Sequence, residues 1–268
     1  MNTSNTSKLI KPTRNKIVVY AALAVAGALM PNRSLADYQV NELNSTYHWT
    51  FYNYDSYGNP FSGFHAGILG GAANYSFSWA WDGSTYNDVI AGLGLDNLAS
   101  YNHGWSQFGY NCGEAYNPYN SAGYAQPSVM FYGWANQPKP VEYYVVLVNP
   151  PASIPTVSPG THTAYGYYRG TYWTTENNQT VHYDFFDQPM TNYTFWGYGP
   201  FDQYRVYRRP GATIGTSYSI DLNAIFNQMN AFGMTRIGDP TKMADLRFCT
   251  ETYGDSISGA VNASFWVE

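Results

Sequence analysis

Short runs in which aromatic or β-branched residues alternate with polar ones recur along most of the chain. Alternation with a period of two is typical of strands that bury one face. Many short strands separated by turns rich in Gly, Asn and Pro favour a sandwich or jelly roll over an α/β fold. The sequence therefore predicts an all-β domain of two packed sheets. The clearest runs are NYSFSWAW (74–81), PSVMFYGW (127–134), VEYYVVLV (141–148), TVHYDFF (180–186), QYRVYRR (203–209), ADLRFCTETY (244–253) and VNASFWV (261–267).

One segment, SIDLNAIFNQMNAFGM (219–234), departs from this pattern. Ser219 or Asp221 can cap the start of a helix there, and Gly233 can end it. We therefore expect a single α-helix packed on the back of the β domain, followed by two last strands that GDSISG (254–259) would join as a hairpin. Five apolar residues recur at helical spacing in this segment: Leu222, Ile225, Phe226, Met229 and Phe232.

The first 36 residues have the pattern of a cleavable secretory signal. Basic residues precede an apolar run at 17–30 that is too short to span a bilayer comfortably, and small residues stand at Ser34 and Ala36. An N-terminal anchor helix is the alternative. We expect a signal peptide at 1–36, a single domain at 37–268, and secretion of that domain.

Cleavage at this point would make the protein strongly acidic. The signal segment holds five of the thirteen Lys and Arg and none of the eighteen Asp and Glu, so the net charge would change from −5 to −10. An acidic surface disfavours nucleic acid and anionic membranes as partners. The 27 Tyr, 14 Phe and 8 Trp fit a high strand content and a surface that meets sugar rings equally well.

The cysteines and histidines predict no metal site, because the five histidines are widely spaced and no cysteine cluster accompanies them. The two cysteines are Cys112 and Cys249. In an oxidising compartment they could form a disulfide, and a small buried thiol at Cys249 is equally acceptable.

Two glutamates occupy strands of this predicted domain. Glu142 stands at the head of VEYYVVLV and shares a face with Tyr144, while Glu251 shares the polar face of its strand with Cys249 and Tyr253. Glycoside hydrolysis needs such a pair, one carboxylic acid to protonate the leaving oxygen and one carboxylate to meet the anomeric carbon, about 5–5.5 Å apart for retention. Two acids in a tyrosine hydrogen-bond network without a catalytic role would give the same pattern.

The strands that carry these glutamates resemble the two signature strands of the glycoside hydrolase family 11 xylanases. YGW (132–134) followed by PVEYYVV (140–146) resembles the strands that lead to the family's nucleophile, and CTETYGDSISGAVNASFWV (249–267) those that carry its acid/base. The resemblance spans nearly all of residues 40–268 and implies a curved β-jelly roll whose glutamates face each other across a cleft. Further similar segments follow in the family's order: NYSFSW, DVIAGLG, GYNCG, GYYRGTYWTTENNQTVHYDFF and FDQYRVYRR.

The resemblance implies a secreted, retaining endo-1,4-beta-xylanase, monomeric and without cofactor, that acts on xylan or a related β-linked polysaccharide. Glu142 would be the nucleophile and Glu251 the acid/base. Asp88 would touch the acid/base and lower the pH optimum, because a second carboxyl close to Glu251 couples the two titrations. The residues expected to contact the sugar are Tyr132, Tyr144, Gln203 and Tyr253, with Trp49 or Tyr52 as a stacking platform.

Several segments depart from the family pattern. The run LVNPPASIP after EYYVV is longer and richer in proline, and the thumb hairpin lacks the Pro-Ser-Ile tip. Met190 stands where the family has an arginine near the nucleophile, and Arg205 stands where it has a tryptophan. Because these segments meet the polysaccharide, a β-glucan-cleaving relative and a carbohydrate-binding jelly roll without catalysis stay open as alternatives.

Overall fold

The structure is a computed structural model whose described part begins at Asp37, at the first residue of strand β1. The expected signal peptide (1–36) and residues 192–199 of the thumb lie outside it. No helix of the described part is long and apolar enough to cross a membrane. The described residues are 37–44, 47–55, 63–69, 72–80, 87–95, 106–112, 128–135, 140–151, 153–191, 200–212, 217–237, 246–253 and 258–267.

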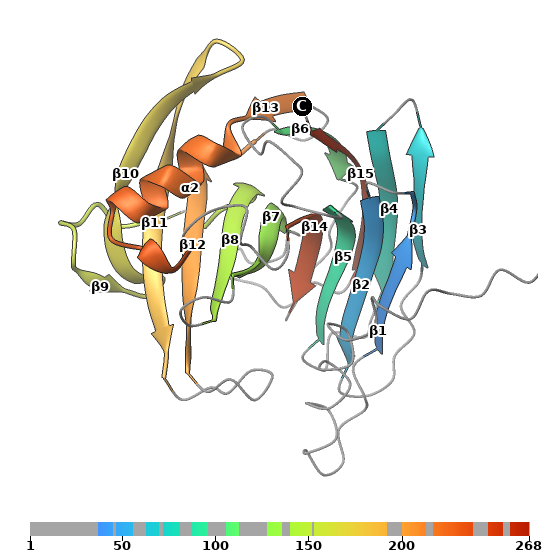
Figure 1. Cartoon of the computed structure of the whole chain (residues 1–268), viewed down its shortest axis with the longest axis horizontal. Helices are drawn as coiled ribbons and strands as arrows, with labels where there is room; N and C mark the ends of the chain where they lie inside the picture. Colours follow the sequence, from blue (N-terminus) through green and yellow to red (C-terminus); the bar gives the residue numbers. More distant parts are fainter. Residues whose placement is uncertain are drawn as a thin grey trace, which may run out of the picture.

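The described strands form two sheets, and Figure 1 shows the larger one running from β10 on one side of the molecule to β1 on the other. The larger sheet has ten strands in the order β1 (Asp37–Glu42), β2 (Tyr47–Asp55), β5 (Asn87–Leu95), β14 (Arg247–Tyr253), β7 (Ser128–Ala135), β8 (Val141–Val148), β12 (Phe201–Arg209), β11 (Gln179–Met190), β10 (Gly166–Glu176) and β9 (His162–Thr163). The smaller sheet has five, in the order β13 (Ser217–Ile220), β6 (Ser106–Cys112), β15 (Ser258–Val267), β4 (Ala72–Ala80) and β3 (Gly63–Leu69). Among these described pairs only β8 and β12 run parallel. The all-β jelly-roll prediction is confirmed.

The main hydrophobic core lies between the two sheets. Phe131 and Phe248 on the larger sheet contact Phe265 on the smaller one, with ring centroids 5.6 Å and 5.4 Å apart. The hydroxyl of Tyr75 in β4 hydrogen-bonds that of Thr250 in β14 at 2.6 Å, so these two buried hydroxyl groups link the two sheets. One face of the larger sheet is therefore buried by the smaller sheet, as expected for aligned sheets that pack through alternate residues.

The predicted helix is confirmed as α2 (Leu222–Ala231). Its N-cap is Asp221, whose side chain accepts a hydrogen bond from the Ala224 amide at 3.0 Å, and Gly233 follows its end with a φ of +82°. Figure 1 shows α2 over the larger sheet, and the Phe226 ring contacts Tyr143 of β8 with centroids 5.6 Å apart. A short 3-10 helix, η4 (Thr235–Ile237), follows it.

The predicted C-terminal hairpin is wrong. Strand β14 pairs with β5 and β7 in the larger sheet, whereas β15 pairs with β4 and β6 in the smaller one. The stretch at 254–257, which lies outside the described residues, therefore connects a strand of the larger sheet to a strand of the smaller one. Turn residues mark where a strand ends, but they do not determine which strand the chain pairs with next.

The second face of the larger sheet has its own cluster of side chains, which we call the open-face cluster. It lies on the side away from the main core and from α2, because residues alternate between the two faces along each strand. Its buried members are Ile90, Met130, Tyr132, Trp134, Val146, Phe186, Phe201, Tyr207 and Cys249, with Tyr144, Ile154, Tyr165, Tyr168 and Met190 packed against them. By register, Glu142 and Glu251 lie on this same face.

Candidate active site

Glu142 is held from two neighbouring strands. It lies in β8 opposite Trp134 of β7 and beside Gln203 of β12, and its exposed fraction is 8%. The Tyr132 hydroxyl donates to Oε1 at 3.0 Å, and the Gln203 Nε2 amide donates to Oε2 at 2.7 Å. Each carboxylate oxygen therefore accepts a hydrogen bond, as a buried acid requires.

The YGW segment orients the first of these donors. Residues i and i+2 of a strand share a face, so Tyr132 and Trp134 both point toward the glutamate. The Trp134 indole Nε1 donates to the Tyr132 hydroxyl at 2.9 Å, which leaves that hydroxyl to donate to Glu142. The Tyr132 ring also contacts Tyr144, with centroids 5.2 Å apart. Tyr132 lies opposite Tyr144 in the β7–β8 register.

The surroundings of Glu142 act on its pKa in opposite directions. Burial raises the pKa of Glu142, while hydrogen bonds from Tyr144, Gln203 and Tyr132 and the charge of Arg205 lower it, and the net result is a pKa above the usual value. Arg205 acts through Gln203 as well, because its Nη2 donates to the Gln203 Oε1 at 2.5 Å. That contact fixes the amide so that its NH₂ faces the glutamate.

Glu251 lies on the same face, two strands away from Glu142. It is half-buried in β14, opposite Ile90 of β5 and Ser128 of β7. Burial, and then the charges of Glu142 and Glu251, raise the pKa of Tyr144 well above the usual value, so this tyrosine lies within electrostatic reach of both acids. The backbones of the two glutamates are offset along β7, with Glu142 opposite Trp134 and Glu251 opposite Ser128.

Four other expected site residues are placed by their backbones alone, since their side chains lie outside the described part. Asp88 in β5 and Tyr253 in β14 are opposite each other, two residues along from the pair of Ile90 and Glu251, so Asp88 is diagonal to Glu251 across the two strands. Trp49 lies opposite Leu93, whose side chain is in the main core, whereas Tyr52 lies opposite Ile90 of the open-face cluster. Of the two candidate stacking platforms, the register favours Tyr52.

The proline-rich segment after β8 folds back over the open face. Ile154 and Tyr165 join the open-face cluster, and the Tyr165 ring lies 5.8 Å from that of Phe186 and 5.7 Å from that of Tyr207. Arg209 donates a hydrogen bond to the Pro151 carbonyl and anchors the segment. The proline-rich segment, in which this chain differs from the family pattern, therefore forms the boundary of the glutamate site on the side of β11 and β12.

The two cysteines belong to different sheets. Cys249 is buried in the open-face cluster, on the side of the larger sheet that faces away from the smaller one. Cys112 lies in β6 of the smaller sheet, and its side chain is outside the described part. This arrangement favours a buried thiol at Cys249 over a disulfide to Cys112.

Sequence reasoning missed the roles of Trp134 and Arg205. The spacing of Trp134 from Tyr132 was a usable signal, because alternate residues of a strand share a face. Arg205 approaches Glu142 through the parallel pairing of β8 with β12, a contact between segments about 60 residues apart that no local pattern reveals.

Among the described residues, no group of three His, Cys, Asp or Glu side chains is placed to hold a metal ion.

Comparison with solved structures places this architecture among xylanases. One of the two major endo-1,4-beta-xylanases of Trichoderma reesei matches 88% of this chain and 99% of its own at 17% identity, with a TM-score of 0.52. A mutant of ENZbleach xylanase matches 97% of this chain and 96% of its own at 19% identity, with a TM-score of 0.56. A loop-swap mutant of Xyn11A from Necallimastix patriciarum matches 86% and 95% at 15% identity, with a TM-score of 0.50.

No protein-family model and no curated protein sequence matches the chain. At identities of 15–19% the structural likeness shows the fold. The chain is therefore a β-jelly-roll protein with the architecture of family 11 xylanases, and the roles of its glutamates are a separate question.

Proposed function

We propose that the protein is a secreted, retaining endo-1,4-beta-xylanase that hydrolyses internal bonds of xylan without a cofactor. The observation that supports this most is the setting of Glu142, whose two oxygens accept hydrogen bonds from Tyr132 and Gln203 on the face that also carries Glu251. A second carboxyl group on that face, near the same tyrosine, supplies the pair that glycoside hydrolysis needs.

The proposed reaction has two displacements at the anomeric carbon. In the first, a carboxylate oxygen of Glu142 bonds to that carbon while the glycosidic C–O bond breaks, and Glu251 gives its proton to the leaving oxygen. In the second, Glu251 takes a proton from water, the water oxygen bonds to the anomeric carbon, and the bond to Glu142 breaks. Configuration is retained, and both glutamates return to their starting states.

The surroundings fit Glu142 as the nucleophile. Three hydrogen-bond donors and a nearby guanidinium lower the pKa of Glu142 and so favour the ionised form that attack requires, while burial keeps the net pKa above its usual value. Met190, at the position of the family's arginine, packs with the apolar open-face cluster. Arg205 supplies the positive charge beside Glu142 in its place, through Gln203.

The remaining proposed roles follow the register. Tyr132, Tyr144 and Gln203 would orient the sugar in the subsite of Glu142, and Tyr253 would do so beside Glu251. Asp88 would share a proton with Glu251 and so lower the pH optimum. Trp49 was a candidate stacking platform, and Tyr52 takes that role here because it lies opposite Ile90.

A β-glucan-cleaving relative is the second candidate. The proline-rich segment that packs Tyr165 onto Phe186 and Tyr207, together with Met190, gives the site a boundary that the family pattern does not predict. A different boundary can admit a different β-linked chain while the two glutamates keep their chemistry.

Release of reducing sugar separates these functions. The purified domain 37–268 should release sugar from xylan between pH 3 and 7, and Glu142→Gln and Glu251→Gln should lower the rate by at least a thousandfold. Activity on β-glucan alone would reassign the substrate. No hydrolysis of any β-glycan would contradict the enzyme assignment and leave the carbohydrate-binding alternative.

A further inference from the structure

Trp173 in β10 is the most exposed large hydrophobic side chain of the described residues. Its exposed fraction is 63%, against 41% for Ile68 and 38% for Tyr167. An indole left in water forgoes a large favourable transfer free energy, and such aromatic rings often mark a binding surface.

The indole is held in a defined orientation. Trp173 lies opposite His182 of β11, and the two rings are tilted by 38° with centroids 4.4 Å apart. The His182 Nε2 lies 3.6 Å from the Asp184 Oδ2, and the other oxygen of Asp184 accepts a hydrogen bond from Thr171 at 2.6 Å. A ring that is already positioned loses little conformational entropy when a ligand covers it.

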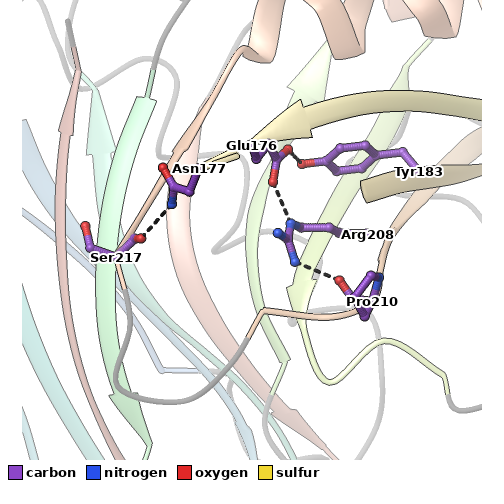
Figure 2. Close-up of polar contacts among 6 residues, drawn as sticks. All are labelled: Glu176, Asn177, Tyr183, Arg208, Pro210 and Ser217. Carbon is purple, nitrogen blue, oxygen red and sulfur yellow. Dashed lines mark hydrogen bonds and ion pairs between the residues drawn. The ribbon is translucent and has the colours of Figure 1, made fainter. Parts of the chain in front are cut away.

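The hairpin tip beyond the indole is rich in hydroxyl and amide groups, and the charged Asp184 and Arg209 lie on its other side, toward β12. Thr175 and Thr180 are opposite each other on the same face, next to the Trp173 and His182 pair, and both are exposed. The turn beyond them is Asn177-Asn178. The one carboxylate of this hairpin tip, Glu176, is buried and paired with Arg208 at 2.8 Å (Figure 2). Of the described residues 171–182, none presents an exposed carboxylate, ammonium or guanidinium group.

Trp173 and its neighbours His182, Thr175 and Thr180, which we call the Trp173 platform, lie on the same face of the larger sheet as the two glutamates but at a distance from them along the sheet. The register runs from Trp173 through His182 to Arg209 of β12, beyond Tyr207 on the same face. Tyr165, packed on Phe186 and Tyr207, stands between this platform and the site of Glu142. Trp173 is therefore outside the catalytic subsites.

We propose that Trp173 is a second glycan-binding site, on which one sugar ring of a neutral β-linked polysaccharide stacks while the catalytic face works on another part of the chain. The choice of a β-linked glycan rests on the proposed function. The site itself rests on the fixed indole and on the hydroxyl- and amide-bearing hairpin tip beyond it. One ring presents far less area than the roughly 800 Å² per partner of a stable protein interface, which disfavours a protein.

Affinity electrophoresis tests this proposal with a matched control. Full-length domain 37–268 carrying Glu142→Gln, which prevents hydrolysis, is run in native gels that contain soluble xylan or soluble β-glucan. Adding Trp173→Ala should weaken retardation, with at least a fivefold rise in the apparent dissociation constant for the retarding glycan. Adding Tyr167→Ala, an exposed aromatic of the same strand on the other face, should leave it unchanged. Trp173→Phe should recover part of the retardation.

The result is separable from the enzyme assignment. With Glu142 intact, Trp173→Ala should cleave a short chromogenic xyloside at the parental rate. Trp173-dependent retardation of a protein that hydrolyses nothing would still support the platform. If the enzyme is active but the gels retard the Trp173→Ala and parental proteins equally, the glycan-binding role of Trp173 is wrong and the enzyme assignment stands. A parental protein that neither gel retards would also contradict this role of Trp173.

Discussion

Glu142 combines two conditions that act on its pKa in opposite directions. Its side chain is almost fully buried, which raises the pKa, and it is surrounded by donors and by the charge of Arg205, which lower it. Alternation along VEYYVVLV predicted that Glu142 would share a face with Tyr144, and the resemblance pointed to Tyr132 and Gln203. The role of Arg205 could not be predicted, because the parallel alignment of β8 with β12 depends on the folding of everything between them.

Replacing Arg205 should shift the pH dependence of catalysis. Because the guanidinium lowers the pKa of Glu142, Arg205→Met should raise that pKa and move the acid limb of the kcat/KM profile to higher pH. Arg205→Lys keeps the charge and should produce a smaller shift. Profiles on a chromogenic xyloside measure this, and an acid limb that is identical in the two variants and the parent would contradict a role for Arg205.

Removing the charge of Glu142 should stabilise the fold at neutral pH. A folded-state pKa above the unfolded value means that the contribution of Glu142 to stability is fully present below the unfolded pKa and is lost as the pH rises through the folded pKa. Glu142→Gln should therefore raise Tm at pH 7 by a few degrees, which corresponds to about 1 kcal/mol. Thermal melts at pH 7 and pH 4 check this, since the gain should shrink at pH 4. An equal or larger gain at pH 4 would contradict a raised pKa of Glu142 in the folded protein.

At the scale of single elements, the long β10–β11 hairpin is tied to its neighbours by a buried polar network (Figure 2). Arg208 of β12 donates to Glu176 at 2.8 Å and to the Pro210 carbonyl at 2.7 Å, and Tyr183 donates to the other oxygen of Glu176. Strand β11 was predictable from its alternation. The network was not, because Arg208 lies on the core-facing side of a strand whose run QYRVYRR carries arginine on both faces.

Removing the cation of this network while its carboxylate stays in place should destabilise the fold. The side chains of Arg208 and Glu176 are 2% and 5% exposed, so Arg208→Met would leave a buried carboxylate without its cation and lower the free energy of unfolding by about 3–5 kcal/mol. Adding Glu176→Gln should recover part of the loss. Urea titrations of the two single variants and the double variant measure the coupling, and strictly additive losses would contradict it.

The glycines of DVIAGLG have a packing role in β5. A Cβ at Gly92 would overlap the Cβ of Cys249 and the carbonyl oxygen of Phe248 in the adjacent strand. Gly92→Ala should therefore lower stability by about 1–3 kcal/mol, the cost of overpacking a rigid site. Gly67→Ala in β3 is the matched control, because nothing lies within 4 Å of the added methyl group. Denaturant melts that show equal effects of the two changes would contradict this explanation.

For the whole molecule, the period-two pattern predicted the all-β class and several of the strands, because burial of one face acts locally. The assignment of strands to sheets is a global property: GDSISG joins two sheets although it reads as a hairpin turn. The same limit applies to the site. The sequence pointed to Glu142 and Glu251, but their offset along β7 and the cover from Tyr165 follow only from the complete sheet.

The central claim is that Glu142 attacks the anomeric carbon and Glu251 supplies the proton. Chemical rescue by azide tests both roles at once, with an aryl β-xylobioside that has a good leaving group. In Glu142→Ala, azide should replace the carboxylate, restore release of the aryl group and yield the α-glycosyl azide. In Glu251→Ala, it should intercept the intermediate on Glu142 and yield the β-glycosyl azide. The reverse assignment of the two anomers, or rescue of neither variant, would contradict the account.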